Sequence, residues 1–235
     1  MPQAATSPAA RRARYEQLPA LLSLVTGDEK HAPSAHSTLD VVWTLYDRFL
    51  RVDPERPDDP DRDRFYLSKG HGPAATYAVL AARGFLDPET LSTHGGFDSS
   101  LGHHPDRALV PGIEIASGSL GHGLPLAVGA ALALRAQRRW RPRLVCLLGD
   151  AELEEGSNHK AIALAGRLGL DRLLAIVVDN RSASHGWPGG IAKRFEVEGW
   201  TSTVASGREH GALERAFAAA RAGRPHVVVA EVETS

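Results

Sequence analysis

The stretch that most constrains the fold covers residues 144–182. It contains an apolar run at 144–148, a helix-like segment at about 152–168, and a second apolar run at 173–178. This order predicts strand, helix and strand in one βαβ unit. Such units cross over right-handed, so the two strands lie parallel and close together in one sheet. We therefore expect an α/β protein whose parallel sheet is flanked by helices on both faces.

Polar residues follow both predicted strands. Gly149 and Asp150 come after the first run, and Asp179, Asn180, Arg181 and Ser182 come after the second. Parallel strands present their carboxyl ends at one edge of the sheet, where open α/β sheets bind ligands. Carboxylate and amide oxygens at that edge are hard ligands, suited to a magnesium ion that also holds phosphates. Asp150 and Asn180 thus indicate a diphosphate site.

The residues around this site resemble a known signature. Gly149-Asp150, Glu155-Gly156 and Asp179-Asn180 together are similar to the thiamine diphosphate motif, which several enzyme families share. Three upstream segments resemble transketolase motifs in the transketolase order: Ser68 to Gly72, Gly102 to Asp106, and Pro111 to Gly123. The resemblance runs from about Val25 to Val232. A complete transketolase is far longer, so the chain resembles only its amino-terminal, diphosphate-binding part.

The resemblance implies an architecture and a partner. Residues 15–235 are expected to form one thiamine-diphosphate-binding (PP-type) domain, after an N-terminal arm at 1–14 that we expect to be disordered. The glutamate that activates the cofactor in transketolases lies on the pyrimidine-binding domain. The chain is therefore expected to act with a separate pyrimidine-binding subunit, as a heterotetramer. The implied reaction transfers a two-carbon ketol unit from a ketose to an aldose, with sugars or sugar phosphates as substrates.

The resemblance also assigns roles to individual residues. It implies magnesium ligation by Asp150, Asn180 and the backbone carbonyl of Ser182. It implies histidines at substrate oxygens, where they can move protons: His31, His71 and His104. It implies cofactor contacts from His71, Gly118, Ser119, Leu120, Gly149, Asp150, Ala151, Glu155, Asn180 and His185. In relatives the glutamate at the position of Glu155 contacts a carboxylate of the partner.

Several positions depart from the family pattern. Ala151 replaces the second glycine of Gly-Asp-Gly, which is tolerable if the backbone there keeps a negative φ. Lys160 replaces an acidic residue near the expected interface. His185 lies in a loop that departs from the usual Ile-Asp-Gly, so its cofactor contact is less defined. The segment Gly102 to Asp106 carries one extra residue, which leaves His103 as a rival to His104.

Other interpretations stay open. The histidines invite comparison with zinc sites, but their spacing fits no common zinc pattern. His31 can also be a solvated loop residue, and His71 a packing residue. A different reaction with the same cofactor, such as acyloin formation or another carbon–carbon ligation or cleavage, is the first alternative. A non-catalytic, degenerate subunit is the second.

Composition narrows the class of protein. The formal net charge is -1, which gives no global attraction to nucleic acid or acidic membranes. The single cysteine, Cys146, lies in a predicted strand and cannot form an internal disulfide. No apolar run approaches the roughly 20 residues that span a bilayer, and residues 1–14 do not form a secretory signal. We expect a cytoplasmic protein.

Local patterns predict further elements. Ser37 or Thr38 is expected to cap a helix that continues through Leu50. Helices are also predicted at about 74–83, closed by Gly84, and at 124–138. Short strands are predicted at 65–67, 201–205 and 227–232.

Overall fold

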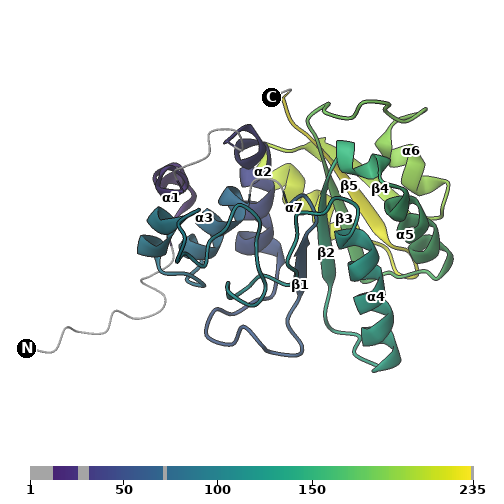
Figure 1. Ribbon diagram of the computed structural model, residues 1–235. Helices are drawn as coiled ribbons and strands as arrows, with labels where there is room; N and C mark the ends of the chain where they lie inside the picture. The colour runs from purple at the N-terminus through teal and green to yellow at the C-terminus, as the bar shows by residue number, and fades with distance from the viewer. Residues whose placement is uncertain (1–12, 26–31, 71–72, 234–235) are drawn as a thin grey trace, which may run out of the picture.

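The computed structural model describes residues 13–25, 32–70 and 73–233. Within these residues, five strands form one parallel sheet in the order β1-β2-β3-β5-β4 (Figure 1). The strands are β1 (Arg64–Leu67), β2 (Leu144–Gly149), β3 (Leu173–Asp179), β4 (Thr201–Ser206) and β5 (His226–Glu231). The predicted βαβ unit is confirmed, because β2 and β3 pair in parallel inside the sheet.

Helices cover both faces of the sheet, as predicted (Figure 1). One layer contains α1 (Leu18–Leu24), α2 (Ala32–Thr44), α3 (Ala74–Ala82) and α7 (His210–Ala218). The other contains α4 (Gly123–Ala136), α5 (Gly156–Arg167) and α6 (Ile191–Glu196). Of the helices in the described ranges, none has the length and apolar character needed to cross a membrane.

The two layers explain the unbroken apolar runs of the strands. Along β2, Val145 and Leu147 enter the core beneath α2 and α3, whereas Leu144, Cys146 and Leu148 enter the core beneath α4 and α5. All five side chains are buried. Alternating side chains point to opposite faces, so a strand covered on both sides must be apolar throughout.

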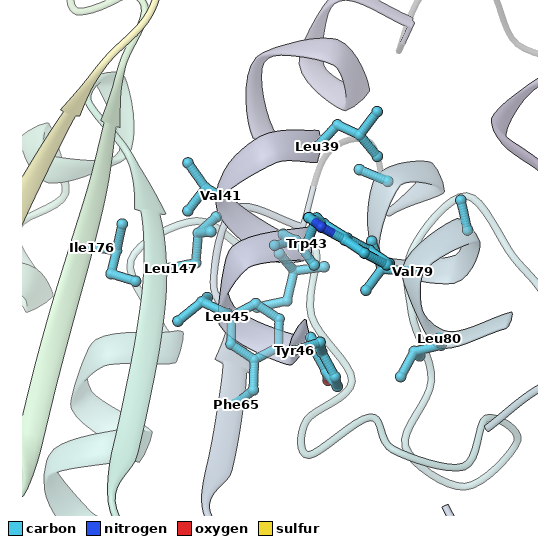
Figure 2. Close-up of a cluster of buried hydrophobic side chains, with 14 of the residues drawn as sticks. Leu39, Val41, Trp43, Leu45, Tyr46, Phe65, Val79, Leu80, Leu147 and Ile176 are labelled. Atoms are coloured by element: carbon cyan, nitrogen blue, oxygen red, sulfur yellow. The ribbon is translucent and has the colours of Figure 1, made fainter. Parts of the chain in front are cut away.

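Helix α2 lies between the sheet and α3. In Figure 2, Val41 of α2 and Leu45, just after α2, face Leu147 and Ile176 of the sheet, while Trp43 of α2 points toward α3. Every residue from 41 to 46 is buried, which a surface helix with one apolar stripe would not show. A π-helical turn, Leu45–Phe49, directly follows α2.

Two predicted helix starts are wrong. Helix α2 begins at Ala32, so Ser37 and Thr38 lie inside it and cap nothing. Pro33 falls in the first turn, where a missing N–H costs least, and the helix can therefore start earlier than the hydroxyls suggested. Helix α5 begins at Gly156, after a 3-10 turn at 151–154. That turn directs the side chain of Glu152 into the protein.

A buried carboxylate fixes the amino-terminal end of β1. Asp63 is fully buried and forms ion pairs with Arg51, at 2.8 Å, and Arg143, at 2.6 Å. Burial by itself raises the pKa of Asp63, but the hydrogen bonds from the two arginines outweigh it and hold that pKa below its usual range. Asp63 directly precedes β1 and Arg143 directly precedes β2, so the ion pair between them holds the starts of the two strands together.

Two helical glycines predict opposite effects of the same substitution. A Cβ on Gly166 would lie 1.8 Å from the carbonyl oxygen of Glu198, whereas a Cβ on Gly129 would meet nothing within 4 Å. We expect Gly166→Ala to lower the free energy of unfolding by about 3 kcal/mol through overpacking. We expect Gly129→Ala to raise it by about 0.5–1 kcal/mol, because alanine restricts the unfolded chain. Urea denaturation of both variants tests this, and changes of the same sign would contradict it.

Candidate functional site

The carboxyl ends of the first three strands converge with the loop that precedes α4. The backbone N–H of Asp150, after β2, donates to the carbonyl of Val178 in β3 at 3.1 Å. The N–H of Gly123, at the start of α4, donates to Oγ of Ser68, after β1, at 3.0 Å. The segments that the sequence singled out therefore meet at one edge of the sheet, where α/β proteins bind ligands.

Asp150 lies at the centre of this edge and is 1% exposed. Its carboxylate accepts hydrogen bonds from the backbone of Ser182 (2.6 Å) and of Ala183 (3.1 Å). It also accepts from Oγ of Ser182 at 2.5 Å and from the N–H of Ala151 at 2.9 Å. The loop after β3 is thus folded over the end of β2, which brings two of the three predicted magnesium-binding residues into contact.

The backbone turns sharply at Arg181, which has a left-handed φ of 59°. This turn lies between Asn180, which is 7% exposed, and Ser182. A carboxylate has about four acceptor positions, which the four donors occupy. The Ser182 hydroxyl can rotate away at least cost and leave one position for a cation. The site then offers buried carboxylate and amide oxygens, a donor set that fits magnesium.

Glu152 is a site residue that sequence reasoning missed. It is 2% exposed, and its carboxylate accepts from Oγ of Ser68 and from the backbone N–H of Gly121 (2.9 Å) and Gly149 (3.3 Å). Burial raises the pKa of Glu152, although these hydrogen bonds act in the opposite direction. One side chain therefore joins the ends of β1 and β2 to the loop before α4. Its spacing from Asp150 was visible in the sequence, but its inward direction was not.

Lys69 brings a positive charge to the same edge. Its Nζ donates to Oγ of Ser37 in α2 at 3.2 Å. Burial lowers the pKa of Lys69 to about 8, while the nearby charges of Asp150 and Glu152 act to raise it. The predicted motif from Ser68 to Gly72 includes Lys69, but the sequence pattern assigns it no role.

Close backbone contacts hold the glycine-rich segments together. A Cβ on Gly70 would lie 2.5 Å from the backbone N of Gly118 and 2.8 Å from Oγ of Ser117. Gly118 has a φ of 137°, which side-chain-bearing residues rarely adopt. The hydroxyl of Ser117 is buried and forms no hydrogen bond with any residue that the structure describes. The glycines are thus required where two loops touch at the site.

The two rival histidines occupy different places. A Cβ on Gly118 would lie 2.5 Å from the ring of His104, so His104 packs directly on this loop. The ring of His103 instead lies beside Gly95 and makes an edge contact with His94, with centroids 5.2 Å apart. His104 is therefore the histidine that the fold brings to the loop before α4. Both rings belong to exposed residues.

The remaining predicted cofactor residues fall into two groups. Gly149 ends β2, and Ala151 begins the following turn without a left-handed φ, so the condition for tolerating its methyl group is met. Ser119 is exposed and Leu120 half-buried in the loop that reaches Gly121. These residues all lie at the carboxyl edge described above.

Glu155 and His185 lie farther out. Glu155 is exposed at the start of α5, with its stem against Gly121. His185 is exposed, and its backbone N–H donates to Glu154 at 2.6 Å. Glu155 is accessible to another chain, as its predicted interface position requires.

Some predictions lie outside the described residues. His31 and His71 are among these, as is almost all of the predicted arm at 1–14. Across the parts of the chain that are described, no group of three or more histidine, cysteine, aspartate or glutamate side chains could hold a metal ion. A zinc site built from the histidines near 94–104 therefore finds no support there.

Comparisons with known proteins identify relatives over nearly the whole chain. Residues 21–234 match the family described as transketolase, thiamine diphosphate binding domain. A Rhodococcoides fascians protein called Ferredoxin fas2 is 55% identical over 218 residues, 93% of this chain and 72% of that protein. A protein from Actinobacillus succinogenes, named as one subunit of an apulose-4-phosphate transketolase, is 34% identical over 207 residues, 85% of this chain and 75% of that protein.

Solved structures have the same fold. A transketolase from Leishmania mexicana aligns with a TM-score of 0.77 and 26% identity, over 94% of this chain and 37% of its own. A Pichia stipitis transketolase mutant aligns with a TM-score of 0.79 and 25% identity, over 92% of this chain and 35% of its own. The chain thus spans about a third of the solved transketolases that it matches.

The name of the Rhodococcoides fascians relative belongs to that protein and can be compared with the cysteine content of this chain. Iron–sulfur clusters are held by several cysteine thiolates. The 235 residues contain one cysteine, Cys146, which is buried in β2. These residues therefore cannot supply such a ligand set.

Proposed function

The chain belongs to the transketolase family as its thiamine diphosphate binding domain, and from this premise we propose that it is the diphosphate-binding subunit of a split transketolase. The observation that carries the proposal is the convergence of Asp150, Ser182 and the Gly118 loop at one edge of the sheet. The chain works together with a separate pyrimidine-binding chain, in a heterotetramer. Relatives named as single subunits of apulose-4-phosphate transketolases support a divided enzyme.

The residues of this chain bind and orient the cofactor. Asp150, Asn180 and the Ser182 carbonyl would hold a magnesium ion, which would offset part of the charge of the diphosphate. The loop at 118–120 would lie beside the ring system, where the absence of a side chain at Gly118 would allow close backbone contact. When bound, thiamine diphosphate supplies the nucleophilic carbon for cleaving a ketose carbon–carbon bond. The partner supplies the glutamate that activates it.

The histidines act on the substrate. His104 reaches the substrate hydroxyls from its position on the Gly118 loop, together with His31 and His71. Neutral imidazole can accept a proton and imidazolium can donate one near neutral pH, so these groups can move protons at the ketose and aldose oxygens. The two-carbon unit then passes to the aldose.

Calorimetry tests the proposal. We expect thiamine diphosphate to bind in the presence of magnesium, and to bind more tightly when a candidate pyrimidine-binding chain is added. Transfer of a two-carbon unit between a panel of ketoses and aldoses is expected only with both chains. Removing magnesium with a chelator is expected to abolish cofactor binding. If neither the chain nor the complex binds the cofactor, the catalytic proposal is wrong, and a non-catalytic partner-binding role becomes the better account.

A further inference from the structure

The side chain of Lys69 lies across the end of β2. Its backbone N–H donates to the carbonyl of Leu147 at 3.0 Å, which fixes the residue against that strand. A Cβ on Gly149 would lie 3.4 Å from Cε and 3.5 Å from Cδ of Lys69, so the lysine stem occupies the space above this glycine. The stem of Lys69 therefore runs past Gly149, at the predicted diphosphate site.

Two buried carboxylates act electrostatically on this ammonium group. Asp150 is 1% exposed and Glu152 is 2% exposed, and the charges of both attract Lys69. In addition, Oγ of Ser37 in α2 accepts from Nζ at 3.2 Å. A buried cation requires anionic or strongly polar neighbours, and here it lies between α2 and the edge of the sheet.

The charges at the site indicate what Lys69 binds. The proposed function adds a diphosphate to a site that already holds Asp150 and Glu152, and one magnesium ion does not offset all of this negative charge. We propose that Lys69 binds the diphosphate of the cofactor directly, as a second cation beside magnesium, an inference that rests on the proposed function. The flexible stem allows Nζ to leave Ser37 and reach a phosphate oxygen without backbone movement.

A purely structural role for Lys69 makes a different prediction. As a counter-ion of Glu152, Lys69 would stabilise the fold and leave diphosphate affinity unchanged. Glu152 already accepts hydrogen bonds from Ser68, Gly121 and Gly149. This carboxylate is therefore stabilised by its own donors, and a diphosphate role for the lysine is compatible with its position.

Calorimetric titration of three full-length variants tests the inference. Lys69→Met keeps the stem and removes the charge, Lys69→Arg keeps the charge, and Lys193→Met removes an exposed lysine of α6 as a matched control. The probes are thiamine diphosphate and inorganic diphosphate, each with magnesium. Both are titrated into the chain and into its complex with the proposed partner. Thermal unfolding of each variant is measured without ligand.

We expect Lys69→Met to weaken the binding of both probes by about tenfold to hundredfold, as for the loss of a charge-assisted hydrogen bond. Lys69→Arg should retain much of the affinity, and Lys193→Met should match the wild type. If Lys69→Met binds both probes as the wild type does, the inference is wrong and the proposed function stands. If Lys69→Met loses stability but not affinity, and adding Glu152→Gln restores stability, Lys69 is only a counter-ion. If the wild type binds neither probe, the proposed function itself fails.

Discussion

Asp150→Ala is expected to weaken magnesium-dependent binding of thiamine diphosphate by at least about hundredfold. Loss of a residue that only orients a metal ligand typically costs ten- to hundredfold in affinity, and a direct ligand should cost no less. The variant also removes the acceptor for the Ser182 and Ala183 backbone N–H groups. The loop over the site should therefore lose its anchor together with the metal.

Asp150→Ala has two effects, the loss of a metal ligand and the loss of the acceptor that holds the loop. Stability measured without ligand reports only the second. Donors left without an acceptor cost about 1–3 kcal/mol each when they stay buried, but those of an outer loop can reach water. We expect Asp150→Ala to lower the free energy of unfolding by about 2–4 kcal/mol. Asp150→Asn keeps the shape of the side chain and removes its charge. It should therefore lower the free energy of unfolding by less than Asp150→Ala does, while still losing the magnesium-dependent binding of thiamine diphosphate.

The measurements are calorimetric titration with and without magnesium, and urea denaturation of the ligand-free chain. Asp61→Ala is a suitable control, because Asp61 is an exposed aspartate before β1, paired with Arg139 at 3.3 Å. It should behave as the wild type in both measurements. Unchanged cofactor affinity in a folded Asp150→Ala protein would contradict the assignment of this residue as the metal ligand.

Among the substitutions at the site, Glu152→Ala is expected to lower the free energy of unfolding most. The substitution leaves the Ser68 hydroxyl and the backbone N–H groups of Gly121 and Gly149 without their acceptor. It also leaves a cavity where a side chain is 2% exposed. We expect a loss of about 3–5 kcal/mol in the free energy of unfolding. Unlike the change at Asp150, this one breaks contacts among three separate segments.

Glu152→Gln is the informative companion variant. Its amide oxygen can still accept from both Ser68 and Gly121, while its NH₂ group meets the Gly149 N–H as a second donor. It should therefore lose only part of the stability. Glu89→Ala, at an exposed glutamate of the 3-10 turn at 88–93, is the control. Urea denaturation measures all three variants, and a Glu152→Ala cost below about 1 kcal/mol would show that Glu152 does not hold the segments together.

The sequence predicted the central unit well because its signal is local. Two unbroken apolar runs separated by a helical segment have few other solutions, and β2 and β3 pair as expected. Gly84 also closes α3 with a φ of 85°, as its position after the helix suggested. The start of α2 was mispredicted because hydroxyl residues suit a helix start, but Thr38 instead donates to the carbonyl of Ala35 inside the helix.

The sequence by itself determined the parallel α/β sheet, the burial of both its faces, and the position of Asp150 at the carboxyl end of β2. These features follow from the period of the apolar residues and from the handedness of βαβ crossovers. Only the tertiary structure decided that Glu152 points inward, that His104 rather than His103 packs on Gly118, and that Lys69 lies across Gly149. Each of these depends on contacts between segments far apart in the chain, and no local pattern of residues records which side chains such contacts bring together.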